Sequence, residues 1–150
     1  MINLRDITAD NFYEVLGLRV AEHQKDFVST VAEALAQAWL YCDTAFPFAI
    51  YADDVPVGFV MLGYYKSRNQ YTLWKFLIDE RHQNKGYGKQ ALKLSIDYLI
   101  NTFNTKEVFT GVYRGNEIAK RLYISFGFKE TGNFEDNMEE LKYTFKQSYI

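Results

Sequence analysis

The chain has 150 residues, a usual length for one domain, and we expect residues 1–150 to form a single domain. Its formal net charge of −2 at pH 7 argues against nucleic-acid binding, which usually requires a strongly basic domain. Cys42 is the only cysteine, so an intrachain disulfide and a cysteine metal cage are excluded, and two histidines give no metal-site pattern. With neither a signal-peptide pattern nor an apolar run of membrane length, the sequence predicts a cytoplasmic protein without a membrane partner.

The first third of the chain predicts one strand and two helices. Ile2–Arg5 reads as a short strand, and Thr8 as the N-cap of the first helix. Thr30 and Glu33 form a capping box at the start of the second helix. Residues at helical spacing are Phe12, Leu16 and Val20 in the first helix and Val31, Leu35, Ala38 and Cys42 in the second. This spacing predicts that Cys42 is a core residue and not a nucleophile.

The middle of the chain has the residue pattern of strands. Phe46–Tyr51 and Val55–Tyr64 are β-rich runs on either side of Ala52-Asp53-Asp54, which is a turn composition, so they predict a hairpin. Tyr71–Ile78 predicts a third strand beside them. The first half of the chain therefore combines helices with a sheet.

The second half predicts two helices and three strands, which completes a mixed α/β domain. A long amphipathic helix follows Gly86, and Asn116 caps a second helix that ends at Phe126 before Gly127. The apolar face of the long helix is Leu92, Ile96, Leu99 and Phe103, and the strands are Val108–Val112, Phe128–Phe134 and Met138–Phe145, the last two forming a hairpin.

Two glycines, Gly86 and Gly88, lie between a strand and the long helix. Without a Cβ, they let the backbone approach a ligand, and the helix N-terminus offers unpaired N–H groups to an anion. Lys85 and Lys89 add positive charge. The loop therefore predicts a diphosphate site, although the glycines alone are equally consistent with a simple turn.

A dinucleotide-binding fold is the second alternative for this loop, because Gly86–Ala91 fits the loose pattern G-x-G-x-x-A. Two features oppose it. Asp79–Lys85 separates the glycines from their strand, and Glu107 begins the next strand, whereas a ribose-binding acid ends one.

A second group of residues shares one side of the following helix: Asn116, Ala119, Leu122 and Tyr123. Taken alone, Asn116 is explained as a cap and Tyr123 as a core residue. Both groups together resemble the two signatures of the GNAT family of N-acetyltransferases. The first is Q/R-x-x-G-x-G/A, here Gln83-Asn84-Lys85-Gly86-Tyr87-Gly88, and the second is residues 116–123 followed by Phe126-Gly127-Phe128.

The resemblance covers nearly the whole chain, since the order of elements also matches. Within the family the chain looks like the bacterial spermine/spermidine (polyamine) acetyltransferases, through Val57-Gly58-Phe59, Phe76–Arg81 and an early helix with Val20, Gln24 and Phe27. The resemblance implies a single-domain α/β acyl-CoA N-acyltransferase fold, with a mixed, mostly antiparallel sheet flanked by helices.

The resemblance also implies an acetyl-CoA (coenzyme A) site. The pantetheine arm would pair with the free edge of Phe76, Leu77 and Ile78, and Asn116 and Ala119 would lie beside it. Tyr123 would lie near the thioester sulfur and protonate the departing thiolate. The pyrophosphate would be held by the loop residues Gln83, Asn84, Lys85, Gly86, Tyr87, Gly88 and Lys89.

The implied activity is direct acetyl transfer to a primary amine of a small cationic acceptor. The first candidate for this acceptor is a polyamine. Another amine (an amino acid, an antibiotic or a protein N-terminus) and a non-catalytic acyl-CoA sensor are the alternatives, and a homodimer is left open. Many relatives carry an acid in the central strand, but Trp74 and Lys75 stand there instead. Glu22 and Asp26 are candidates for binding the distal ammonium, although a solvated helix face is the simpler explanation for both.

Overall fold

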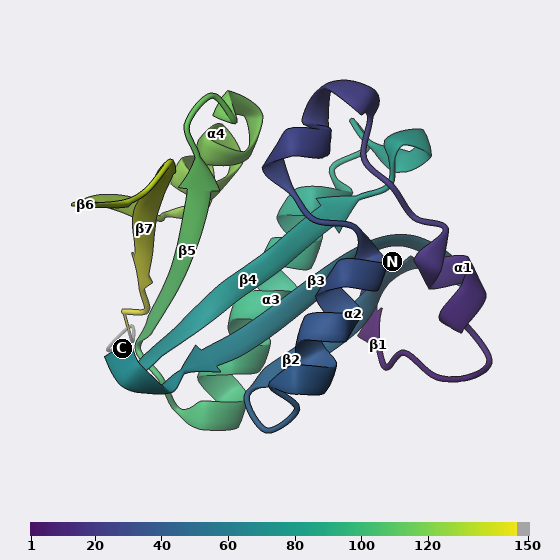
Figure 1. The fold of residues 1–150 in the computed structure, drawn as a ribbon, viewed down its shortest axis with the longest axis horizontal. Helices are drawn as coiled ribbons and strands as arrows, with labels where there is room; N and C mark the ends of the chain where they lie inside the picture. Colours follow the sequence, from purple (N-terminus) through teal and green to yellow (C-terminus); the bar gives the residue numbers. More distant parts are fainter. Residues whose placement is uncertain (147–150) are drawn as a thin grey trace.

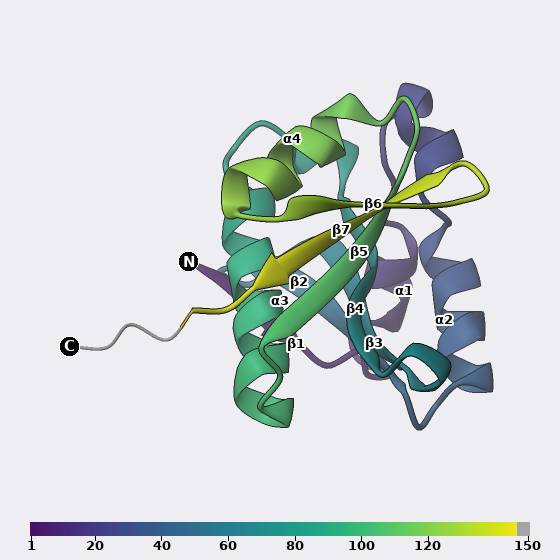
Figure 2. The same cartoon turned by 90° about the vertical axis from the view of Figure 1, so that its left-hand side faces the viewer.

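The computed structural model describes residues 1–146, which form one seven-stranded sheet with helices on both faces (Figures 1 and 2). The strand order is β1-β2-β3-β4-β5-β7-β6. The strands are β1 (Ile2–Arg5), β2 (Ala45–Ala52), β3 (Val55–Tyr65), β4 (Gln70–Ile78), β5 (Glu107–Tyr113), β6 (Lys129–Glu135) and β7 (Met138–Thr144). The helices are α1 (Phe12–Leu16), α2 (Val31–Leu40), α3 (Tyr87–Phe103) and α4 (Glu117–Phe126), with 3-10 helices η1 (Glu22–Phe27), η2 (Lys66–Arg68) and η3 (Glu80–His82).

The sheet is antiparallel except between β4 and β5, which run parallel. These two strands pair only at Thr72 with Phe109 and at Leu73 with Thr110. Beyond that point they diverge, and α4 lies over the β5 side (Figure 1). The divergence leaves the C-terminal half of β4 without a neighbour on one edge. The predicted α/β class and mostly antiparallel sheet are confirmed.

A β-bulge lies at the point where β4 leaves β5. Met61 of β3 pairs with Lys75, but the next residue, Leu62, pairs with Leu73, so Trp74 is the extra residue. After the bulge, Phe76 packs against the core on the α3 side, and Leu77 packs on the opposite side with α1 and α2. The bulge thus bends β4 and sets which side chains face each layer.

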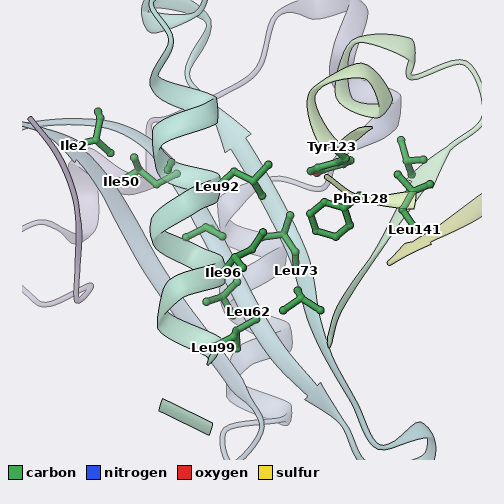
Figure 3. Packing of buried hydrophobic residues seen from close by; sticks show 14 of the residues in the cluster. Ile2, Ile50, Leu62, Leu73, Leu92, Ile96, Leu99, Tyr123, Phe128 and Leu141 are labelled. Carbon is green, nitrogen blue, oxygen red and sulfur yellow. The ribbon is translucent and has the colours of Figure 1, made fainter. Parts of the chain in front are cut away.

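The larger core lies between α3 and the sheet (Figure 3). Leu92, Ile96 and Leu99 of α3 point onto the central strands, as their spacing predicts. Tyr123 and Phe128 extend this core to the C-terminal strands, with ring centroids 5.5 Å apart. Burying such an aliphatic or aromatic side chain stabilises the fold by about 1.5–3 kcal/mol. The core therefore fixes α3 and α4 on either side of the gap between β4 and β5.

The predicted first helix is too long: α1 ends at Leu16, and Val20 lies in no helix. The cause is a tertiary contact, because the Arg19 N–H donates to Asp79 Oδ2 at 3.0 Å and the Glu80 N–H donates to the Arg19 carbonyl at 2.8 Å. These bonds hold the chain in an extended path along the end of β4. They override the helical spacing of the sequence.

Two smaller predictions were also wrong. Asn11, not Thr8, is the N-cap residue of α1, and its side chain accepts a hydrogen bond from the Thr8 N–H. Cys42 is exposed and lies beyond the end of α2 at Leu40, so it is not a core residue. The Thr30 cap is confirmed, since its hydroxyl accepts from the Glu33 N–H at 3.2 Å.

No helix within residues 1–146 combines the length and apolarity needed to cross a membrane.

Candidate active site

A cleft of about 2300 Å³ opens where β4 and β5 diverge. It is lined by the free edge of β4, the N-terminal turn of α3, one side of α4, the η1 segment and the β6–β7 hairpin. The volume exceeds the roughly 300–1,000 Å³ of a typical small-molecule pocket. The cleft therefore has room for a long ligand and a second, smaller one.

The N-terminus of α3 opens onto this cleft. Gly86 is the N-cap residue and adopts φ +80°, a conformation that side chains disfavour. A Cβ on Gly88 would lie 3.5 Å from Leu122 and 3.8 Å from Ile78, which is ordinary contact, so the fold itself does not require glycine there. The first N–H groups of a helix have no internal partner. A bare backbone with free N–H groups fits a diphosphate.

Most of the residues predicted for the site line this one cleft, although they come from five separate segments. Lys85 is exposed and does not line it. The predicted residues that line the cleft are Glu22, Asp26, Phe76, Leu77, Ile78, Gln83, Asn84, Gly86, Tyr87, Gly88, Lys89, Asn116, Ala119 and Tyr123.

The side chain of Gln83 is engaged within the protein. Its Nε2 donates to the Ile78 carbonyl at 2.9 Å and to Gln24 Oε1 at 2.8 Å. Gln83 therefore fastens the loop to the end of β4 and to η1, and its side-chain amide has no N–H left to donate to a ligand. The Ile78 carbonyl is occupied by the same contact.

Phe76 is the residue of the β4 edge that exposes its backbone to the gap. The N–H and C=O of one residue point to the same side of a strand, and the side alternates along the chain. The Ile78 carbonyl points away from β3, toward Gln83, whereas the Leu77 carbonyl lies against Gly58 of β3. By this alternation Phe76 shares the direction of Ile78. Of the three residues predicted for this edge, Phe76 has the free pair of backbone groups.

Asp79 is a buried carboxylate that fixes the end of β4. It accepts from the N–H groups of Arg19 and Arg81, each at 3.0 Å, and from Arg81 Nε at 2.8 Å. Burial alone would raise the pKa of Asp79, but these hydrogen bonds and the Arg81 charge hold it below its ordinary value. The ionised carboxylate positions the loop that leads to Gly86.

Asn116 is confirmed as the N-cap of α4, and its Oδ1 accepts from the Ala119 N–H at 3.4 Å. Tyr123 lies two turns further on the same side, 6% exposed, and lines the cleft. Burial raises the pKa of Tyr123 to about 12, although the nearby Thr110 hydroxyl acts in the opposite direction. The phenol therefore keeps its proton at neutral pH.

Thr110 is a site residue that the sequence did not reveal. It is buried on β5, and its Oγ1 donates to the Leu73 carbonyl at 3.0 Å, beside the last paired residues of β4 and β5. It also lies close to Tyr123. A threonine inside a strand carries no signal by itself, so only the fold identifies it.

Glu22 and Asp26 lie on η1 and not at the end of the first helix. Both are exposed, and Glu22 pairs with Lys25 at 2.9 Å. The segment crosses the gap, because Gln24 binds Gln83 on the β4 side and the Phe27 ring lies beside Gly115, before α4. Both carboxylates are therefore held at the rim of the cleft.

Further acidic side chains line the cleft from α2 and the β6–β7 hairpin, and none was predicted from the sequence as a site residue. Glu139 is bonded to Lys120 at 2.8 Å, and Glu135 to Arg68 at 2.8 Å. The remaining acids of this set are Glu33, Asp136 and Glu140. Because sequence distance hides their proximity, only the folded chain reveals an acidic wall.

Comparison with known proteins agrees with this architecture. The model of the acetyltransferase (GNAT) family matches residues 5–128. The spermine/spermidine N(1)-acetyltransferase of Bacillus subtilis strain 168 is 32% identical over 146 residues, which cover 93% of this chain and 95% of that protein. A probable spermine N(1)-acetyltransferase of Bacillus subtilis subsp. natto is 31% identical with the same coverage.

Solved structures share the fold at lower identity. A spermidine N-acetyltransferase from Vibrio cholerae, in complex with CoA and spermine, superposes with a TM-score of 0.77 at 17% identity, covering 95% of each chain. The PaiA N-acetyltransferase of Thermoplasma acidophilum, in complex with coenzyme A, gives a TM-score of 0.70 at 16% identity, covering 97% of this chain and 99% of that one.

Proposed function

The chain belongs to the acetyltransferase (GNAT) family, and from this premise we propose that it transfers the acetyl group of acetyl-CoA to a primary amine of a polyamine such as spermidine or spermine. One observation carries the proposal. The free edge of β4, the N-terminus of α3 and the buried phenol of Tyr123 all open onto one cleft. The substrate class in the proposal rests on the curated relatives, which are named for spermine and spermidine.

Acetyl-CoA supplies an activated thioester and leaves as free coenzyme A in each turnover. On the protein side, the N–H groups at Gly86–Lys89 receive the pyrophosphate, and Phe76 offers its backbone C=O to the pantetheine arm. Lys89 adds charge at the cleft wall, whereas exposed Lys85 acts at longer range. Asn116 and Ala119 form the opposite wall on α4.

The acceptor must lose a proton before it can attack. An alkyl ammonium has a pKa of about 10.4, so deprotonation near pH 7 costs about 4.6 kcal/mol. β4 carries no acid, and the carboxylates that line the cleft come from η1, α2, the β6–β7 hairpin and Glu80 of η3. We assign proton removal to water held along this acidic wall.

Tyr123 supplies a proton to the leaving sulfur. Its raised pKa, about 12, keeps Oη protonated at the working pH, and its burial excludes water from that proton. The phenol lies close to Thr110, which belongs to the last paired residues of β4 and β5. The Phe76 N–H, on the free edge, stabilises the negative charge that develops on the carbonyl oxygen.

Glu22 and Asp26 bind the distal ammonium of the polyamine. The position of the two residues supports this role, because η1 crosses the gap and carries both carboxylates at the rim of the cleft. Lys25 partly neutralises Glu22, so Asp26 contributes the larger share. A cytoplasmic location and a homodimer remain predictions.

Thiol release from acetyl-CoA, measured with a panel of amines, tests this proposal. The panel contains spermidine, spermine, a monoamine, an amino acid, an aminoglycoside and a peptide with a free N-terminus. We expect the highest kcat/KM with the polyamines. Preference for another amine would refute the polyamine assignment alone, and no release with any amine, despite acetyl-CoA binding, would favour a non-catalytic sensor.

A further inference from the structure

Lys75 is a lysine inside the cleft that the proposed reaction does not use. It follows the bulge residue Trp74 and immediately precedes Phe76, the residue that offers its backbone to the pantetheine arm. One strand residue spans about 3.3 Å, and a lysine stem is long and flexible. The Lys75 amine is therefore within reach of the position where a bound thioester would lie.

The surroundings of Lys75 differ from those of the lysines on the surface. It is half-buried, and Nζ lies 5.9 Å from the centroid of the Trp74 ring. Within residues 1–146 it forms no ion pair, a feature that it shares with exposed lysines such as Lys66 and Lys89 but combines with partial burial. No ion pair has to be broken for the Lys75 side chain to move toward the gap.

Burial also favours the reactive form of this amine. It lowers the pKa of Lys75, and the negative charge of Glu33 on α2 acts in the opposite direction. A larger fraction of Lys75 is therefore neutral at a given pH than of a solvated lysine, and only the neutral amine is a nucleophile.

We propose that Lys75 is a self-acetylation site, at which the chain modifies itself when acetyl-CoA is bound and no amine acceptor occupies the cleft. This inference rests on the proposed function, because it uses the same acetyl-CoA site. The Lys75 Nζ forms a bond to the acetyl carbonyl carbon, the carbon–sulfur bond breaks, the sulfur leaves as coenzyme A, and the proton of Nζ passes to the sulfur through solvent. The product is an amide, which is not an activated acyl group, so the acetyl group remains on Lys75.

Mass spectrometry of the intact chain and of its peptides tests the proposal after incubation with acetyl-CoA alone. We expect one acetyl group per chain, on the peptide that contains Lys75, with slower labelling when spermidine is added. Lys75→Arg keeps the charge and removes the nucleophile, so it should abolish this label. Lys66→Arg is the matched control, because Lys66 also lines the cleft but is exposed, and it should label normally.

A second variant tests the mechanism independently of folding losses. Glu33→Gln removes the charge that keeps Lys75 protonated and should accelerate labelling, up to about tenfold if the pKa falls by one unit. Labelling spread over exposed lysines, or unchanged in Lys75→Arg, would overturn the proposal. Rapid acetylation of spermidine without any Lys75 label would refute self-acetylation alone. A Lys75 label without turnover of any amine would uphold it and refute the polyamine assignment.

Discussion

Gly88→Ala separates the demands of the fold from those of the ligand. A Cβ at this position meets Leu122 and Ile78 only at 3.5 and 3.8 Å, so the variant should fold. Alanine is a better helix former than glycine by up to about 1 kcal/mol, and the free energy of unfolding should rise or stay level. In the proposed complex with acetyl-CoA, however, the Cβ would stand where the first turn of α3 approaches the pyrophosphate.

The expected loss follows from the contacts at stake. A hydrogen bond to a charged group contributes about 1.5–3 kcal/mol, so losing one should weaken acetyl-CoA binding by about 10- to 100-fold. Calorimetric titration measures the affinity, and thermal unfolding measures the stability. Gly86→Ala is the comparison, since φ +80° should destabilise that variant by about 1–2 kcal/mol as well. Unchanged affinity in a stable Gly88→Ala would refute a phosphate site here.

Three further outcomes are expected. Tyr123→Phe should lower kcat by about 10²–10⁴-fold while calorimetry shows unchanged acetyl-CoA affinity. An unchanged kcat would mean that Tyr123 only packs in the core and donates no proton. Asp79→Asn should lower the free energy of unfolding by about 1.5–3 kcal/mol at neutral pH. Because the folded pKa of Asp79 is lowered, its stabilisation is present above about pH 4 and is lost as the pH falls through the folded pKa, so acid unfolding curves of wild type and variant should converge. Glu22→Gln with Asp26→Asn should raise KM for spermidine several-fold but barely for a monoamine, and salt should shrink the difference; equal effects on both amines would remove these acids from the site.

The sequence predicted the fold well where local pattern and tertiary structure agree. The spacing of Leu92, Ile96 and Leu99 specified α3, because one apolar face has a single way to pack on the sheet. Asn116 combined cap chemistry with the following helical pattern, and its helix begins where expected. The hairpins also followed from turn composition, since Asp53 and Asp136 adopt positive φ in their turns.

The sequence failed where a distant contact decides the local structure. Arg19 is bound by Asp79, sixty positions away in the chain, and this contact ends the first helix early. Cys42 continued a helical spacing that stops at Leu40, so its predicted burial was wrong. Thr110 acquires its place beside Tyr123 only because β5 pairs with β4 for two residues and then diverges.

The divergence of β4 and β5, on which the candidate site depends, has no signature in the local residue pattern, and only the family resemblance implied the free edge at Phe76–Ile78. The bulge at Trp74 results from the pairing of β4 with β3, which no single strand pattern specifies. The loop at Gly86 was identifiable because glycine has a distinct backbone role next to a helix N-terminus. Roles were thus predictable where residue chemistry is distinctive, and positions across the cleft were not.

Competition between amines in one vessel tests the central claim most directly. Equimolar spermidine, a monoamine of similar length and an amino acid compete for acetyl-CoA with the wild-type chain, and mass spectrometry quantifies each acetylated product. The ratio of products equals the ratio of kcat/KM values. We predict that N-acetylated spermidine dominates the mixture. A product mixture dominated by either of the other amines, or no acetylated amine at all, would contradict acetyl transfer to a polyamine.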